Sequence, residues 1–412
     1  MDRRQSHSVL RLRNILITLL VVIVAIGVLV AVGAYVLFGQ GAGVEPPSLD
    51  YPTGVEKEEQ IEYVMREHVI DEGGQPVHSF LLYVENEPQN VTIHKGVGTT
   101  GRNDVPVDEE YQYKVASITK MFVATVILQL MEEGELDLQD PAATYLREID
   151  YLRYDELHVL DGEACSDEIT IDQLLQHRTG LADIFIDTET RFYVNVLTHP
   201  RARYSPERIM DTFFKYGLNE EPHFKPGEGY YYSDINYVLL GLIIEQITGD
   251  SLPQQIRQRI LVPLDMSDTY FEFYEPAQGD GKQIDTYLGR LNVTRDVYTS
   301  HEWGGGGLVS TTRDTATYIQ ALFDVELFES ESTLQVMMDN SENEAEGKTY
   351  ARGINVYPLG DDTYYGHGGF YGSLLVYNPE KGITFSAHVA QANLPYDAEA
   401  LVEVLLEIVE NP

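Results

Sequence analysis

The chain has 412 residues, of which 43% are hydrophobic and 10% aromatic, a composition typical of one or two folded domains with a sizeable core. Its formal net charge is −38, which argues against nucleic acid as a partner because such a surface repels the phosphate backbone. Cys165 is the single cysteine, so an intrachain disulfide and a cysteine-based metal site are both excluded.

The N-terminal region has the pattern of a membrane anchor. Residues 15–38 are uncharged and rich in Ile, Val and Leu, and the stretch exceeds the ~20 residues that span a bilayer as a helix. The arginines of this region all precede it, so we expect residues 1–14 in the cytoplasm and the rest outside the cell membrane. A cleaved signal peptide is the alternative, but its apolar region is normally only ~7–15 residues long. The pattern therefore favours a single-pass, uncleaved anchor in the cell membrane.

A Gly- and Pro-rich stretch, residues 39–58, follows the anchor and is predicted to be a flexible linker. Residues 59–412 then form one globular unit, in which two zones of strands flank a helix-rich middle. The predicted strands are residues 77–84, 91–95, 353–356, 363–365, 373–377 and 383–389. The short turn at residues 378–382 predicts that the last two strands pair as a hairpin.

Several helices have clear start or stop signals. One begins at Ser117, continues with apolar residues at helical spacing and ends near Gly134. Ser205 followed by proline opens another helix. Further helices are predicted at residues 236–249, which are apolar nearly all round and so expected to be buried, from Thr311 or Thr312 to about 323, and at 401–409.

Ser117 and Lys120 lie at the start of the first of these helices. Residues i and i+3 share a helix face, so the hydroxyl and the amine can meet. A serine hydroxyl needs a base to become a good nucleophile, and a lysine can be that base where a dry site holds it neutral. The N–H groups and dipole of a helix N-terminus also favour a developing oxyanion. The spacing indicates a nucleophile and its base, and a helix cap beside a solvated lysine is the alternative for this motif alone.

A second candidate is the Gly-rich loop of residues 226–234, which leads into the predicted buried helix. Its Tyr232 is a candidate general base or acid if cationic neighbours depress the pKa of the phenol. An aromatic packing loop that ends in an N-cap at Ser233 or Asp234 is the alternative.

A third candidate is the segment of residues 365–372, where His367 lies among glycines at the start of a predicted strand. Glycine in a strand often marks the close approach of a ligand, so Gly368 and Gly369 suggest a substrate-binding edge. A backbone N–H there can complete an oxyanion hole with the N–H of Ser117. A bulged hairpin strand with a surface histidine is the alternative.

In this order, the three motifs resemble the Ser-x-x-Lys, Tyr-x-Asn and Lys-Thr-Gly or His-x-Gly signature of penicillin-recognising serine hydrolases. The most similar branch contains class C β-lactamases, D-alanyl-D-alanine carboxypeptidases, D-aminopeptidases and related esterases. Shorter matches to this branch lie at residues 174–181, 237–249, 263–266 and 305–314, so the resemblance covers roughly residues 60–410.

The resemblance implies an α/β (α+β) fold, in which helices flank an antiparallel sheet built from both chain ends and an all-helical lobe is inserted. The cleft is expected between sheet and lobe. Ser117 is implied as the acylated nucleophile, Lys120 and Tyr232 as the proton-transfer groups, the N–H groups of Ser117 and Phe370 as the oxyanion hole, and His367 as a substrate-positioning residue. No metal and no organic cofactor is implied.

Two residues depart from the family pattern. Asp234 stands where the family usually has Asn, and an ionised carboxylate accepts hydrogen bonds where an amide can also donate. A nearby carboxylate also favours the ammonium form of a lysine, so we hypothesise that Tyr232 carries more of the base role and that Asp234→Asn leaves activity similar or raised. His367 replaces Lys and is mostly neutral at pH 7, so it holds a substrate carboxylate less firmly. Both changes argue against an efficient β-lactamase.

Two other segments are expected to have a structural role. His301-Glu302 lacks the second histidine of a zinc-protease helix, and residues 304–307 predict a tight turn near the cleft.

The sequence therefore predicts a membrane-anchored, extracytoplasmic serine hydrolase. It acts through an acyl-enzyme on D-amino-acid peptides of the cell wall, as a D-alanyl carboxypeptidase does, or on small esters and amides. A non-catalytic penicillin-fold sensor or binding protein is the alternative from another class, and a true β-lactamase is a third. The expected partners are this small-molecule or peptidoglycan-peptide substrate and the membrane.

Overall fold

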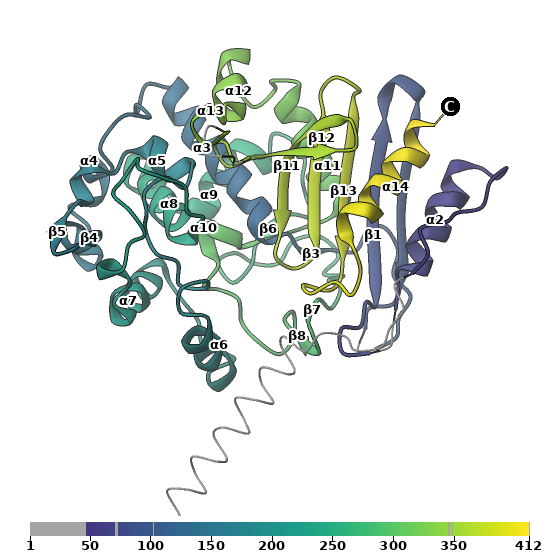
Figure 1. The fold of residues 1–412 in the computed structure, drawn as a ribbon, viewed down its shortest axis with the longest axis horizontal. Coiled ribbons are helices and arrows are strands. Elements are labelled where there is room, and N and C mark those ends of the chain that lie inside the picture. The colour runs from purple at the N-terminus through teal and green to yellow at the C-terminus, as the bar shows by residue number, and fades with distance from the viewer. Residues whose placement is uncertain (1–46, 71–72, 102, 345–346, 348, 412) are drawn as a thin grey trace, which may run out of the picture.

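The computed structural model of the protein describes residues 47–70, 73–101, 103–344, 347 and 349–411. Within this part of the chain the main feature is a six-stranded antiparallel sheet with the strand order β10-β11-β12-β13-β1-β2. Its strands come from both ends of the domain, as the colours of Figure 1 show. The bounds are β1 (Ser79–Asn86), β2 (Val91–Gly98), β10 (Asn355–Leu359), β11 (Asp362–Gly369), β12 (Ser373–Asn378) and β13 (Ile383–Val389).

The two ends of the domain meet where β1 pairs antiparallel with β13, with Phe80 opposite Val389. Every residue of β13 is buried, as expected for a central strand that is covered on both faces. The predicted hairpin between β12 and β13 is confirmed. Its turn is stabilised by Asn378, whose side-chain oxygen accepts the N–H groups of Glu380 (2.9 Å) and Lys381 (3.0 Å).

Helices cover both faces of the sheet. Because side chains alternate along a strand, Phe80 and Leu82 of β1 pack in one hydrophobic cluster while Leu81 packs in another. The first cluster includes α2 (Lys57–Glu67) and α14 (Ala398–Glu410), and Figure 1 shows both helices on the same side of the sheet. The second cluster includes α3 (Thr119–Glu132) and α11 (Thr312–Phe323), so the sheet lies between two helical layers.

The middle of the chain forms a lobe beside the sheet (Figure 1), built around the buried helix α8 (Asp234–Thr248). Residues 235–244 of α8 are all buried, and Gly249 ends the helix with φ 72°, as the sequence predicts. The predicted start of α7 is confirmed too, since the Ser205 hydroxyl accepts the N–H of Arg208. The remaining α-helices are α4 (Ala143–Leu146), α5 (Ile171–Leu175), α6 (Glu189–Thr198), α7 (Pro206–Tyr216), α9 (Leu252–Ile256), α10 (Trp303–Gly306), α12 (Glu331–Met338) and α13 (Ser341–Glu344).

The prediction of an all-helical lobe is wrong in detail, because short strands occur between the helices. The hairpin β4–β5 turns at Asp161 (φ 53°) and Gly162 (φ 84°), the two positive φ angles that a tight two-residue turn requires. A three-stranded sheet, β3-β9-β6, and a second hairpin, β7–β8, lie nearer the main sheet. The bounds are β3 (Tyr113–Lys114), β4 (Val159–Leu160), β5 (Glu163–Ala164), β6 (Tyr270–Phe271), β7 (Tyr287–Leu288), β8 (Leu291–Asn292) and β9 (Leu308–Ser310).

The predicted membrane anchor, residues 15–38, lies outside the described residues. Among the helices of the described ranges, none combines the length and the apolar character that crossing a membrane requires. Of the predicted linker, residues 47–56 precede the first described helix, which begins at Lys57.

Candidate active site

Ser117 lies in a short 3₁₀ turn, η2 (Ala116–Ile118), that leads directly into α3. The preceding residue, Ala116, has φ 50°, a left-handed conformation that costs energy for a residue with a side chain. The segment is held in place by β12, because the Ser373 hydroxyl donates to the Val115 carbonyl (2.9 Å). Backbone strain of this kind is concentrated at functional sites, and here it occurs next to the predicted nucleophile.

Lys120, the second residue of α3, is fully buried, and its amine contacts three acceptors. The nitrogen lies 3.1 Å from Ser117 Oγ, 2.5 Å from Asp234 Oδ1 and 2.7 Å from the Gly305 carbonyl oxygen. Gly305 is a glycine for a steric reason, since a Cβ there would lie 2.4 Å from Asp234 Oδ1. The alternative of a solvated lysine beside a helix cap is therefore wrong.

Tyr232 lies in the loop that leads into α8 of the lobe, and its hydroxyl is 3.0 Å from Ser117 Oγ. Lys120 Nζ lies 4.9 Å from the centre of the Tyr232 ring. The condition set for Tyr232 as a base, a depressed pKa of the phenol, is not met: burial and the neighbouring Asp234 carboxylate raise the pKa of Tyr232 well above its usual value. The resting side chain is a phenol that donates its proton to Ser117 Oγ.

The Tyr232 loop is positioned by His177, which is fully buried. The His177 carbonyl accepts the N–H of Tyr231 (2.9 Å), and His177 Nδ1 accepts the N–H of Ser233 (3.2 Å). The Asn236 amide also donates to Nδ1 (3.0 Å), which places the imidazole proton on Nε2. Burial lowers the pKa of His177 well below its usual value, so the ring is neutral and packs with its centre 4.2 Å from that of Tyr232.

The third motif lies at the end of β11 and not at its start, because the strand continues through the glycines. His367 is 3% exposed: Nδ1 donates to the Gly368 carbonyl (2.6 Å) and Nε2 accepts from the Tyr350 hydroxyl (3.3 Å). Burial and Lys120 lower the pKa of His367 to about 3. The ring is thus neutral and buried, so the alternative of a surface histidine is wrong, while its substrate-positioning role stays a prediction.

Gly369 allows β11 to approach the nucleophile. A Cβ at this position would lie 2.1 Å from Ser373 Oγ and 2.3 Å from the Val115 carbonyl oxygen, so no larger residue fits. At Gly368, by contrast, the nearest atom to such a Cβ is the Tyr357 hydroxyl, at 3.4 Å. The close packing at Gly369 puts the next residue, Phe370, at the wall of the same cavity as Ser117.

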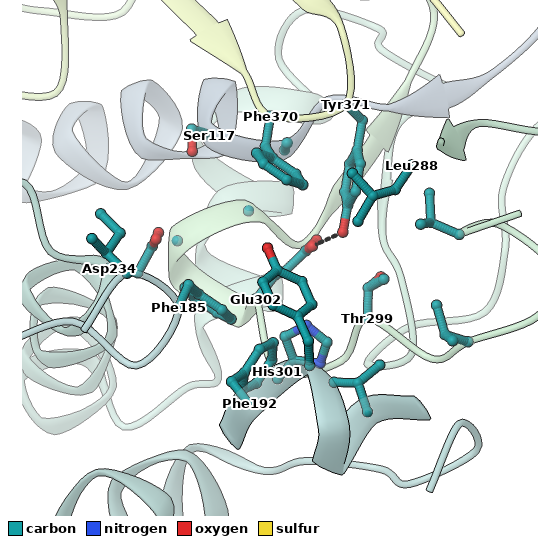
Figure 2. A pocket seen from close by; sticks show the side chains of 18 of the residues that line it. Ser117, Phe185, Phe192, Asp234, Leu288, Thr299, His301, Glu302, Phe370 and Tyr371 are labelled. Atoms are coloured by element: carbon teal, nitrogen blue, oxygen red, sulfur yellow. Dashed lines mark hydrogen bonds between the residues drawn. The ribbon is translucent and has the colours of Figure 1, made fainter. Parts of the chain in front are cut away.

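This cavity has a volume of about 400 Å³ and opens beside Ser117 (Figure 2). That volume lies within the usual range for a small-molecule site. Phe185 and Phe192 of the lobe face Leu288 and Phe370 across it. The lobe and the sheet side of the molecule both contribute residues to the lining, as expected for a cleft between sheet and lobe.

The chain matches known proteins over most of this domain. Residues 69–408 match the family described as Beta-lactamase. The chain belongs to the β-lactamase family. Protein flp of Staphylococcus aureus (strain MW2) is 28% identical over 218 residues, which are 53% of this chain and 39% of flp, so the match spans less than half of that relative.

Solved structures show the same fold. The D-stereospecific amidohydrolase from Streptomyces sp. aligns with a TM-score of 0.68 at 24% identity, over 83% of this chain and 96% of its own. The D-amino acid amidase from Ochrobactrum anthropi SV3, complexed with L-phenylalanine amide, aligns with a TM-score of 0.69 at 23% identity, over 85% and 97%. At these identities the likeness establishes the β-lactamase-like fold.

One acidic residue of this β-lactamase-family domain, Asp183, was not singled out from the sequence. Asp183 is fully buried, and its carboxylate accepts the N–H groups of Asp234 (2.7 Å), Phe185 (2.7 Å) and Ile186 (2.9 Å). It thereby joins the start of α8 to the cavity wall. Burial and the Asp234 charge raise the pKa of Asp183 to about 7.

Glu302, assigned a structural role from the sequence, lines the cavity together with His301. The Tyr371 hydroxyl donates to the Glu302 carboxyl group, as the dashed line in Figure 2 shows. Burial raises the pKa of Glu302 to about 8. Residues 303–306 form the short helix α10 instead of a tight turn, and its Gly305 and Gly306 line the cavity.

Proposed function

We propose that this domain is a serine hydrolase that forms an acyl-enzyme on Ser117 and cleaves amides or esters of D-amino acids. One observation carries the proposal: Ser117 Oγ is contacted by both Lys120 Nζ (3.1 Å) and the Tyr232 hydroxyl (3.0 Å) at the wall of a cavity of about 400 Å³. A nucleophile in contact with two proton-transfer groups is the arrangement that covalent catalysis needs.

The contacts of Lys120 indicate how it would act as a base. The Gly305 carbonyl and the Asp234 carboxylate can only accept, so each takes an N–H of the amine. In the neutral amine, the remaining lone pair faces Ser117 and accepts its proton. The amine acts as the base once a proton has left the site.

The steps then follow from these positions. Ser117 Oγ forms a bond to the substrate carbonyl carbon as its proton passes to the Lys120 amine, which gives a tetrahedral intermediate. The Tyr232 phenol donates its proton to the leaving amine or alcohol as the carbon–leaving-group bond breaks, and the Lys120 ammonium restores the phenol. Water then attacks the acyl-enzyme by the reverse proton path, which frees the acid and Ser117.

We assign the oxyanion to the N–H groups of Ser117 and Phe370. Ser117 lies at the N-terminal end of α3, where the helix dipole favours negative charge. Gly369 brings the end of β11 against η2, which sets Phe370 beside the cavity. Ser117 leads into α3 and Phe370 directly follows β11, so both N–H groups are positioned by the fold before substrate binds.

The choice of substrate is supported by the amidase names among the structural neighbours and by the two departures from the family motifs. The neutral, buried His367 offers no cation for a substrate carboxylate, which disfavours a β-lactamase. D-alanyl carboxypeptidase activity on cell-wall peptides is the alternative that the family resemblance suggests. A non-catalytic sensor would need an inactive serine, and the contacts of Ser117 argue against it.

The full-length protein should be treated with a fluorescent phosphonate, and the labelled peptide should be identified by mass spectrometry. We expect labelling of Ser117 and none in Ser117→Ala. Turnover of D-amino-acid amides, short acyl esters, D-Ala-D-Ala peptides and nitrocefin then ranks the substrates. A folded wild-type protein that neither labels nor turns over any of these compounds would make the domain a non-catalytic binding protein.

We further propose that residues 15–38 anchor the domain to the outer face of the cell membrane. The support is the sequence alone: an uncharged stretch longer than the ~20 residues of a membrane-spanning helix, preceded by arginines. Membrane fractionation tests this, with protease added to intact cells. Recovery in the soluble fraction, or protection of the domain from protease, would contradict it.

A further inference from the structure

The cavity has an uneven charge distribution. Among the described residues that line it are two carboxylic acids, Asp234 and Glu302, and no lysine or arginine. Lys120 lies behind the wall with its side chain fully buried and is paired with Asp234. Lys114 lies behind Thr299 and is paired with Glu272. Each nearby cation is thus matched by an acid, and the cavity presents carboxyl groups to a ligand.

Asp234 is the acid next to the nucleophile. Its side chain is 18% exposed, while that of its partner Lys120 is 0% exposed, so the carboxylate and not the amine meets the cavity. One nitrogen atom, Lys120 Nζ, bonds both Asp234 and Ser117, so the carboxylate lies within two hydrogen-bond lengths of the attacking oxygen. In an amino-acid derivative the α-amine is separated from the reacting carbonyl carbon by one atom. An α-amine of the acyl group therefore falls within reach of Asp234.

Most of the remaining lining is apolar. Phe185, Phe192, Leu288 and Val297 line it together with Ile186, which is 54% exposed. These side chains form a surface that suits a large aliphatic or aromatic group.

Glu302 places little negative charge beside an apolar ligand at neutral pH. Its carboxyl group is hydrogen-bonded by the Tyr371 hydroxyl, and burial raises the pKa of Glu302 to about 8. The group is therefore mostly uncharged at pH 7, and Asp234, which is ion-paired with Lys120, is the acid left to bind a cation in the cavity.

We propose that the cavity selects substrates whose acyl group carries both an ammonium group and a large apolar side chain, that Asp234 binds the ammonium group, and that substrates bearing a carboxylate are rejected. The inference rests on the proposed function and names its substrate class. A bound ammonium group competes with Lys120 for Asp234, because both are cations that this carboxylate can pair with.

The kinetic test compares three substrates on the full-length protein: D-phenylalanine amide, its N-acetyl derivative and its N-succinyl derivative, which are cationic, neutral and anionic. We expect kcat/KM to fall in that order, by roughly tenfold or more at the first step. Asp234→Asn should reduce the ratio between the first two substrates to about twofold or less. The matched acid-to-amide change Glu302→Gln should keep the wild-type ratio at pH 7, because the group it replaces is mostly neutral there.

Binding to Ser117→Ala gives a second readout that needs no catalysis. Calorimetry should show that the cationic amide binds more tightly than the N-acetyl amide, and that the added Asp234→Asn change removes the difference. Equal binding, or a preference for the N-succinyl compound, overturns the inference even if Ser117 labels with phosphonate. Failure of labelling with intact ammonium selectivity would instead overturn the proposed function and leave the ammonium site standing.

Discussion

Tyr232→Phe is the sharpest test of the proton path, because it removes one oxygen atom from the site. The hydroxyl lies 3.0 Å from Ser117 Oγ, while the ring packs on His177 with 4.2 Å between the ring centres and should keep its place. Proton transfer by a positioned side chain contributes ~10²–10⁴-fold to the rate, or about 3–5 kcal/mol of transition-state stabilisation. The folded state should lose only about 1 kcal/mol, the net contribution of one hydrogen bond. We therefore expect a large loss of rate in a stable protein.

The assay is the pre-steady-state rate of acylation with D-phenylalanine p-nitroanilide, whose amine leaving group must be protonated, with folding checked by circular dichroism and urea denaturation. Tyr231→Phe is the matched control, since this neighbouring hydroxyl donates to Asp187 (2.8 Å) and does not contact the serine. Acylation of Tyr232→Phe within about threefold of wild type would refute the assigned role, because so small a change is under 1 kcal/mol. An equal loss in both variants would point to a disturbed loop.

Three further predictions concern stability. Since burial raises the pKa of Glu302 from 4.5 to about 8, the folded state holds a proton that the unfolded state releases, and its contribution to stability is lost as the pH rises from about 4.5 to about 8. Relative to Glu302→Gln, the wild type should lose on the order of 2–4 kcal/mol between pH 5 and pH 8 in urea denaturation, and parallel pH curves would exclude this. Gly369→Ala should lower the melting temperature and the rate of acylation, because the added Cβ would lie 2.3 Å from a backbone oxygen. Gly368→Ala, the matched control, should change the free energy of unfolding by less than about 1 kcal/mol. Equal melting temperatures for the two variants would contradict the packing argument. Arg352→Met should cost about 3–5 kcal/mol of unfolding free energy, because it leaves the buried Asp172 carboxylate without its partner at 2.6 Å, and a cost below about 1 kcal/mol would show that water replaces the guanidinium.

Sequence signals correctly predicted the helix starts and the hairpin turn that are stabilised by hydrogen bonds between neighbouring residues. Ser205 with its proline began α7, Thr311 capped α11, and the Asn378 turn closed the β12–β13 hairpin. In each case the stabilising hydrogen bond lies within a few residues of the signal, so no tertiary information was needed. The family motifs also identified the residues that meet at Ser117, although the sequence places Lys120 and Tyr232 more than a hundred positions apart.

Residues whose properties depend on burial were predicted poorly. The glycines around His367 suggested an exposed binding edge, yet the ring is buried and bonded to Tyr350. A role for Tyr232 as a base depended on a pKa lowered by cationic neighbours, but desolvation and Asp234 raise that pKa. No motif announced the contact of Asp183 with Asp234, because the N–H group that it accepts there belongs to a distant segment of the chain.

The order of three short motifs in the chain determined the family and named the nucleophile, since a residue type at fixed spacing is a property of the sequence itself. The tertiary structure decided the electrostatics of the site. It exposes the Asp234 carboxylate to the cavity, buries the Lys120 amine and keeps the buried His367 neutral. These properties depend on the distance between charges and on their separation from water, and both are set only when the lobe and the sheet pack together.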